Sequence, residues 1–107
     1  MTDIETIVVT WLDKRNIQYA FQVPLLGGST SMGGAVVDIV IPDLMLAWRI
    51  QGEYWHRGVE KEGSDLVQKE LLIGLGYTVV DLWADDLLDV DRREDTLRKA
   101  MQGEGVI

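Results

Sequence analysis

The sequence contains no cysteine, which excludes disulfide bonds and any zinc site with cysteine ligands. No apolar run approaches the ~20 residues that a membrane-spanning helix needs. The N-terminus also lacks the basic and then apolar segments of a signal peptide. We therefore expect an intracellular, cytoplasmic protein that makes no use of a membrane.

Positive charge is scarce as well. The chain has 10 Lys and Arg against 18 Asp and Glu, for a formal net charge of −8. This balance argues against a large basic surface of the kind that drives nonspecific nucleic-acid binding. Any interaction with nucleic acid has to be reconciled with that acidity.

What is present is typical of one globular domain. The 107 residues are 47% hydrophobic and 26% charged, with no repeat or low-complexity tract. This length suits one small domain with one modest core. We therefore treat residues 1–107 as a single domain.

Apolar residues at helical spacing predict three helices. Thr2 and Glu5 have the spacing of a capping box, and the first helix is expected over residues 3–15. A second helix is expected from a Ser64 cap to Gly74 or Gly76. A third is expected over residues 91–102, and its inward-facing residues would be Leu97, Ala100 and Met101.

Four segments have strand patterns. Residues 17–23 alternate, and the side chains expected on one face are Ile17, Tyr19, Phe21 and Val23. Residues 34–41 and 44–51 flank a turn and predict a hairpin, and residues 77–83 follow a helix and so should pair in parallel. The expected fold is α/β, with an α-β-β-β-α-β core in which helices flank a mixed four-stranded sheet.

Asp38 interrupts a β-branched run, Val36 to Ile41, that predicts a buried strand. Burying a carboxylate costs several kcal/mol unless something pairs with it. Two partners would satisfy it: a metal ion, or backbone amides of the Gly-rich loop that precedes the strand.

The segments that follow Asp38 carry a more specific pattern. One hairpin later comes Gly52-x-Tyr54-Trp55-His56, and further on an Asp opens a helix before Gly-Tyr, a strand and Trp83. This pattern resembles the PD-(D/E)xK nuclease superfamily, and within it the very short patch repair (Vsr) endonucleases and the related EDxHD homing endonucleases. The resemblance implies a restriction-endonuclease-like core.

The resemblance also implies roles for particular residues. Asp38 would bind the catalytic Mg²⁺, for which Mn²⁺ could substitute, and His56 would activate or orient the attacking water. Glu5 and Asp65 would support the metal-bound waters and the histidine. Vsr enzymes carry a structural zinc, but without cysteine none is expected here.

Each of these residues also has a structural alternative. The sole role of Glu5 could be to close the capping box, and the sole role of Asp65 could be to complement a helix dipole. Trp55 and Tyr54 could pack in the core or a loop instead of stacking on DNA bases. Positive side chains that could contact phosphates are Arg57 and Lys61, whereas for Arg49 we favour an ion pair within the sheet.

The resulting expectation is a Mg²⁺-dependent endodeoxyribonuclease domain of bacterial or phage-like origin. Its acidity suggests that affinity for DNA comes from a fused or separate DNA-binding module, or from a homo-oligomer. The third strand lacks the acid and lysine of the wider superfamily and has Arg49 and Gln51 instead. This departure leaves an alternative: the chain could be a nuclease-fold module that has lost catalysis and acts in protein interaction or assembly. A nuclease acting on RNA or branched DNA also stays open.

Overall fold

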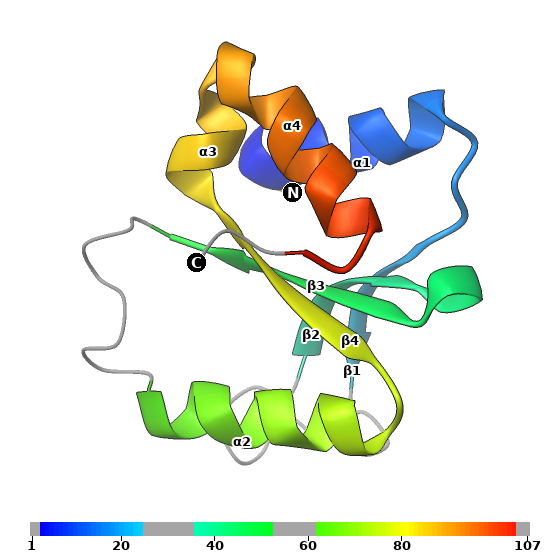
Figure 1. Cartoon of the computed structure of the whole chain (residues 1–107), viewed down its shortest axis with the longest axis vertical. Coiled ribbons are helices and arrows are strands. Elements are labelled where there is room, and N and C mark those ends of the chain that lie inside the picture. The colour runs from blue at the N-terminus through cyan, green and yellow to red at the C-terminus, as the bar shows by residue number, and fades with distance from the viewer. Residues whose placement is uncertain (1–2, 25–35, 53–61, 105–107) are drawn as a thin grey trace.

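A four-stranded sheet runs through the molecule between helices on both of its faces (Figure 1). The computed structural model describes residues 3–24, 36–52 and 62–104, apart from the side chains of 24, 36 and 62–66. The strands, in spatial as well as chain order, are β1 (Ala20–Pro24), β2 (Val36–Ile41), β3 (Leu46–Gln51) and β4 (Thr78–Trp83).

Strand directions agree with the sequence-based expectation. β1 and β3 each pair antiparallel with β2, and β4 pairs parallel with β3. A short 3₁₀ helix, η2 (Pro42–Leu44), connects β2 to β3 and forms the turn of the expected hairpin. The mixed sheet and its α-β-β-β-α-β order are therefore confirmed.

The helices are divided unequally between the two faces of the sheet. Figure 1 shows α1 (Asp3–Lys14), α3 (Ala84–Leu88) and α4 (Val90–Met101) on one face and α2 (Glu62–Gly74) on the other. The short α3 was not expected, because its five residues are too few to show a helical period. No helix in the described part of the chain is long and apolar enough to cross a membrane.

The N-termini of α2 and α4 show which residues begin each helix. Ser64 is not the cap of α2, since the helix already begins at Glu62, where an acidic residue suits the helix dipole. Asp89 caps α4, and its carboxylate accepts hydrogen bonds from the amides of Asp91 at 2.9 Å and Arg92 at 3.2 Å. Part of the acidic run at 85–91 therefore starts this helix.

The core consists of two layers, one on each face of the sheet. The larger lies under α1 and α4 and is centred on Trp48, which is fully buried and donates its indole N–H to the Ala100 carbonyl at 3.1 Å. Leu97 and Ala100 are buried there as expected, and Met101 packs at its edge. The smaller layer lies under α2 and contains Val37, Val40, Ala47 and Leu72.

Strand β1 does not alternate as its sequence suggests. Phe21 packs against the larger core layer, but Val23 packs against the smaller one, so the expectation of one shared face is wrong at Val23. The cause is Gln22 between them, which has a left-handed backbone with φ of 52°. One such residue turns the following side chain to the opposite face of the strand.

The left-handed backbone of Gln22 predicts that glycine is favoured at this position. A non-glycine residue in this conformation costs about 1–2 kcal/mol, so Gln22→Gly should raise the free energy of unfolding by about 1 kcal/mol. Gln18→Gly is the matched control, because Gln18 has no such backbone and should lose about 0.5–1 kcal/mol. Urea denaturation of both variants is the measurement, and a destabilised Gln22→Gly would contradict this account.

Candidate active site

Charged and polar side chains gather at one end of the sheet. The first half of β2 lies beside the carboxyl ends of β3 and β4, because β2 runs opposite to these two parallel strands. In open α/β sheets, ligands bind outside the carboxyl ends of the strands. The side chains near this end are Glu5 from α1, Asp38 of β2, and a group on the α2 side that contains Arg49, Gln51 and Asp81.

Asp38 lies where β2 separates from β3, while its pairing with β1 continues on either side of Asp38. The pairing of β2 with β3 runs from Ile41↔Leu46 to Ile39↔Trp48. Beyond it, the amide of Ile50 donates to the Asp38 carboxylate (Oδ2) at 2.7 Å. The carboxylate thus takes the place of a backbone acceptor within the sheet. The backbone partner of Asp38 comes from β3, while the Gly-rich loop expected to supply one lies mostly outside the described residues.

Across the sheet, Gln22 lies opposite Asp38. The register of β1 with β2 pairs Phe21 with Ile39 and Val23 with Val37, which places the left-handed residue beside the aspartate. Both strands change face here, since Val37 and Ile39 also pack on opposite sides of the sheet. Nothing in the sequence of β1 indicates this irregularity, so Gln22 was missed.

Glu5 approaches the same place from α1. Its side chain is only 8% exposed, and the Gln22 carboxamide (Nε2) lies 3.5 Å from its Oε2 atom. That distance is long for a hydrogen bond and adds little energy, but it places the carboxylate over β1. Thr2, the other half of the expected capping box, lies outside the described residues. The burial of Glu5 and its approach to Gln22 show that its side chain is turned toward the sheet.

The electrostatics of Asp38 follow from these neighbours. Burial raises the pKa of the Asp38 carboxyl, the hydrogen bond from the Ile50 amide lowers it, the charge of Glu5 raises it and Arg49 lowers it, with the net effect upward. Two neighbouring carboxylates, one buried and one half-buried, repel one another. This arrangement is one that a bound cation would stabilise.

Arg49 forms the ion pair within the sheet that its position suggested. It is 6% exposed, and its guanidinium donates to both oxygens of Asp81, from Nε at 2.8 Å and from Nη2 at 3.0 Å. Gln68 accepts from Nη1 at 3.2 Å, and Gln51 donates to Asp81 at 3.2 Å. The two β3 positions that differ from the wider nuclease superfamily are thus joined in one network.

Asp81, Gln51 and Gln68 were missed as neighbours of the site. One signal could have found Asp81. It occurs in Val79-Val80-Asp81-Leu82, and Asp38 occurs in the near-identical Val36-Val37-Asp38-Ile39. A carboxylate at the same place in two buried strands indicates two polar positions at one sheet end.

The other predicted site residues are not tested by the structure. Tyr54, Trp55, His56, Arg57 and Lys61 lie outside the described residues. Asp65 lies in the first turns of α2, and its side chain is likewise outside them. Their roles stay predictions.

The described residues supply two carboxylates for a metal, from Glu5 and Asp38. Within the described ranges, no group of three or more His, Cys, Asp or Glu side chains gathers as a metal site. Mg²⁺ commonly uses one or two carboxylates and completes its shell with water and substrate phosphates. The donor set therefore fits Mg²⁺ in oxygen chemistry and in number.

Comparisons with known proteins agree with this architecture. No protein-family model and no curated protein matches the chain. Among solved structures, it is similar to the catalytic domain of homing endonuclease I-Bth0305I, with 25% identity, a TM-score of 0.65 and coverage of 94% of each chain. The chain has a nuclease fold. The expected restriction-endonuclease-like architecture is thereby confirmed.

The raised pKa of Asp38 predicts how its replacement affects stability. An acid with a raised pKa in the folded state costs stability once the pH rises above its unfolded pKa, and the cost is complete above the folded pKa. Asp38→Asn removes this cost and keeps an oxygen that can accept from the Ile50 amide. Its free energy of unfolding should equal or exceed that of the wild type at neutral pH, and the difference should shrink as the pH falls.

Denaturation at neutral and acidic pH checks this prediction. Asp43→Asn is the control, because it makes the same chemical change at an exposed acid on η2, away from the strand ends. A loss of more than about 1 kcal/mol in Asp38→Asn at neutral pH would show that the fold needs the charge, since that loss is typical of a net hydrogen bond.

Proposed function

We propose that this chain is the catalytic domain of a metal-dependent DNA endonuclease that hydrolyses phosphodiester bonds. The observation that carries the proposal is that Glu5 and Asp38, two acids near the strand ends of this fold, lie close enough for their charges to interact. The similarity to a homing endonuclease catalytic domain over 94% of the chain supports it. The motifs around Asp38 and His56 favour the Vsr-like and EDxHD branch of such nucleases.

The cation of this proposal is Mg²⁺, with Mn²⁺ as a substitute. Glu5 and Asp38 would hold it through carboxylate oxygens. When bound, such an ion neutralises negative charge that develops on the scissile phosphate. The Ile50 amide fixes the Asp38 carboxylate in place, at 2.7 Å, before any cation arrives. Preorganisation of this kind lowers the cost of assembling the site.

Arg49 has a supporting part in this proposal. Its guanidinium is buried in a bidentate pair with Asp81, and its positive charge lowers the pKa of Asp38. It thereby opposes the effects of burial and of Glu5 and favours the ionised carboxylate that a cation requires. The absence of an acid and a lysine on β3 is consistent with this role.

The remaining assignments concern residues outside the described ranges. His56 would take a proton from the attacking water as a neutral imidazole, and Asp65 would orient it. Tyr54 and Trp55 would contact bases, and Arg57 and Lys61 would contact phosphates.

Loss of the Asp38 charge should abolish cleavage. Asp38→Asn keeps the shape of the side chain but removes the charge that binds the cation, so nicking of supercoiled plasmid with Mg²⁺ or Mn²⁺ should disappear. Asp43→Asn should nick at the wild-type rate, because Asp43 lies on η2, outside the group of side chains at the strand ends. Wild-type nicking by Asp38→Asn would refute the metal assignment.

His56→Ala should slow the chemical step and leave metal affinity nearly unchanged. The expected loss of rate is roughly 10²–10⁴, the usual contribution of a general acid or base. Single-turnover cleavage and Mn²⁺ titration measure the two effects separately. If metal affinity fell while the rate at saturating metal was preserved, His56 would be a ligand or a structural residue.

A folded wild-type chain that cleaves no substrate would favour the inactive interaction module instead. Duplex, branched and single-stranded DNA and RNA should all be tried with both cations before that conclusion. In that case the Arg49–Asp81 ion pair would serve only to stabilise this end of the sheet.

A further inference from the structure

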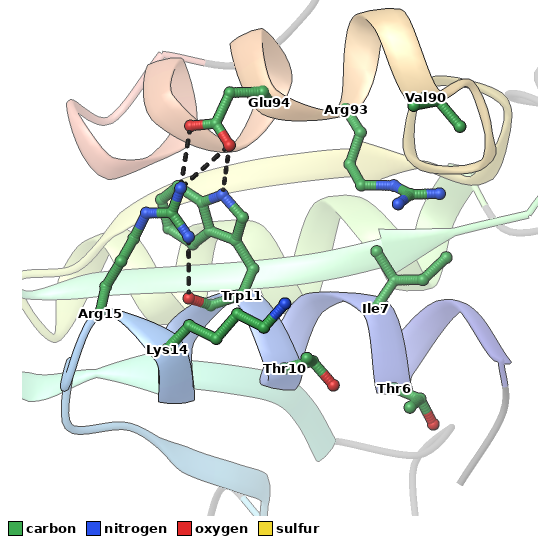
Figure 2. Close-up of a pocket in the computed structure, with 9 residues that line it drawn as sticks. All are labelled: Thr6, Ile7, Thr10, Trp11, Lys14, Arg15, Val90, Arg93 and Glu94. Atoms are coloured by element: carbon green, nitrogen blue, oxygen red, sulfur yellow. Dashed lines mark hydrogen bonds and ion pairs between the residues drawn. The ribbon is translucent and has the colours of Figure 1, made fainter.

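A second candidate binding site is lined by residues of α1 and α4 and includes neither Glu5 nor Asp38. A hollow of about 460 Å³ lies between α1 and α4 (Figure 2). Its apolar residues are Ile7, Trp11 and Val90, and Thr6 and Thr10 add hydroxyl groups. The charged residues that line it are Lys14, Arg15, Arg93 and Glu94.

The charge of this hollow is opposite to that of the chain. Three of the 10 Lys and Arg residues line it, against one carboxylate, whereas the whole chain carries −8. At physiological salt, charges more than about 8 Å away are largely screened in solvent. A ligand in the hollow therefore interacts mainly with these local cations, and the overall acidity matters little to it.

The single acid of the hollow is already satisfied. Glu94 accepts from Arg15 at 3.0 and 3.2 Å and from the Trp11 indole N–H at 3.0 Å. The Arg15 guanidinium also stacks on Trp11, 3.9 Å from the ring centroid, and donates to the Trp11 carbonyl. This group forms a fixed wall at one end, and its ion pair balances Glu94 without using the other two cations.

Those two cations are available to a ligand. Lys14 has no ion-pair or hydrogen-bond partner within the described part of the chain. Arg93 uses Nε to donate to the Leu87 carbonyl at 2.7 Å, which fixes the side chain and leaves its two terminal nitrogens for other acceptors. Figure 2 shows Lys14 reaching along the hollow from α1 and Arg93 reaching into it from α4.

We propose that the hollow between α1 and α4 binds backbone phosphates of duplex DNA. Cations supplemented by threonine hydroxyls are the groups that proteins use to contact phosphate oxygens. An open hollow with cations from two helices suits an extended polyanion, which can contact both at once. This inference rests on the proposed nuclease function and gives the acidic chain a place to hold its substrate outside the catalytic end of the sheet.

Salt-dependent binding tests the proposal. Lys14→Gln and Arg93→Gln should each weaken binding of a duplex oligonucleotide and reduce the slope of log affinity against log salt by about one. The matched controls are Arg92→Gln and Lys99→Gln on α4. They make the same change in net charge, but these cations pair with Asp86, Asp89 and Asp95, and neither they nor these acids line the hollow. The controls should keep the wild-type slope.

The measurement is made with EDTA, so it does not depend on cleavage. A chain that cleaves nothing can still pass this test, which separates the two proposals. Equal losses in the hollow variants and the controls, or no loss in either, would overturn the inference. So would displacement of DNA by polyglutamate as readily as by competing duplex, because the hollow would then bind any acidic polymer.

Crosslinking supplies a second measurement that keeps all cations in place. The chain has no cysteine, so Thr10→Cys in the hollow can carry the only photoreactive label. We expect this variant to crosslink to duplex DNA and Gln102→Cys, at the far end of α4, not to do so. Crosslinking from position 102 alone would overturn the proposal.

Discussion

The hydrogen bond from the Ile50 amide to the Asp38 carboxylate is the contact on which the rest of the site depends. It makes a side chain substitute for a backbone acceptor, and the regular pairing of β2 with β3 stops at Ile39↔Trp48. On the other side of β2, the left-handed Gln22 turns β1 at the same level. The sheet is therefore irregular on both sides of one half-buried acid, and Glu5 packs over this place from α1.

The two groups of charges at this end of the sheet are balanced differently. Arg49 and Asp81 compensate one another through a bidentate pair, with Gln68 and Gln51 taking further hydrogen bonds. Asp38 and Glu5 instead repel, and burial adds to the cost. Proteins retain such unfavourable pairs where function needs them, at the expense of stability. This contrast distinguishes the proposed cation site from the structural ion pair beside it.

Charge is also distributed unevenly over the outer surface. Arg92 and Lys99 pair with acids on or beside α4, so they add little free positive charge. Lys14 and Arg93 differ because their neighbours in the hollow are hydroxyl and apolar groups, and the one acid there is held by Arg15 and Trp11. A net charge of −8 thus describes the average surface and not the local field at a particular helix pair.

Local patterns in the sequence determined the elements and the fold class. Apolar periodicity located α1 and α4, β-branched runs located β2 and β4, and the acid inside β2 marked the site. These features could be predicted because propensity and burial act over a few neighbouring residues. Only the tertiary structure decided that Val23 faces α2, that the charge of Glu5 acts on Asp38, that Arg49 pairs with Asp81 and that Lys14 and Arg93 share a hollow. Each of these contacts joins residues from different elements, and their geometry depends on strand register, on the backbone of Gln22 and on helix packing, none of which a local pattern encodes.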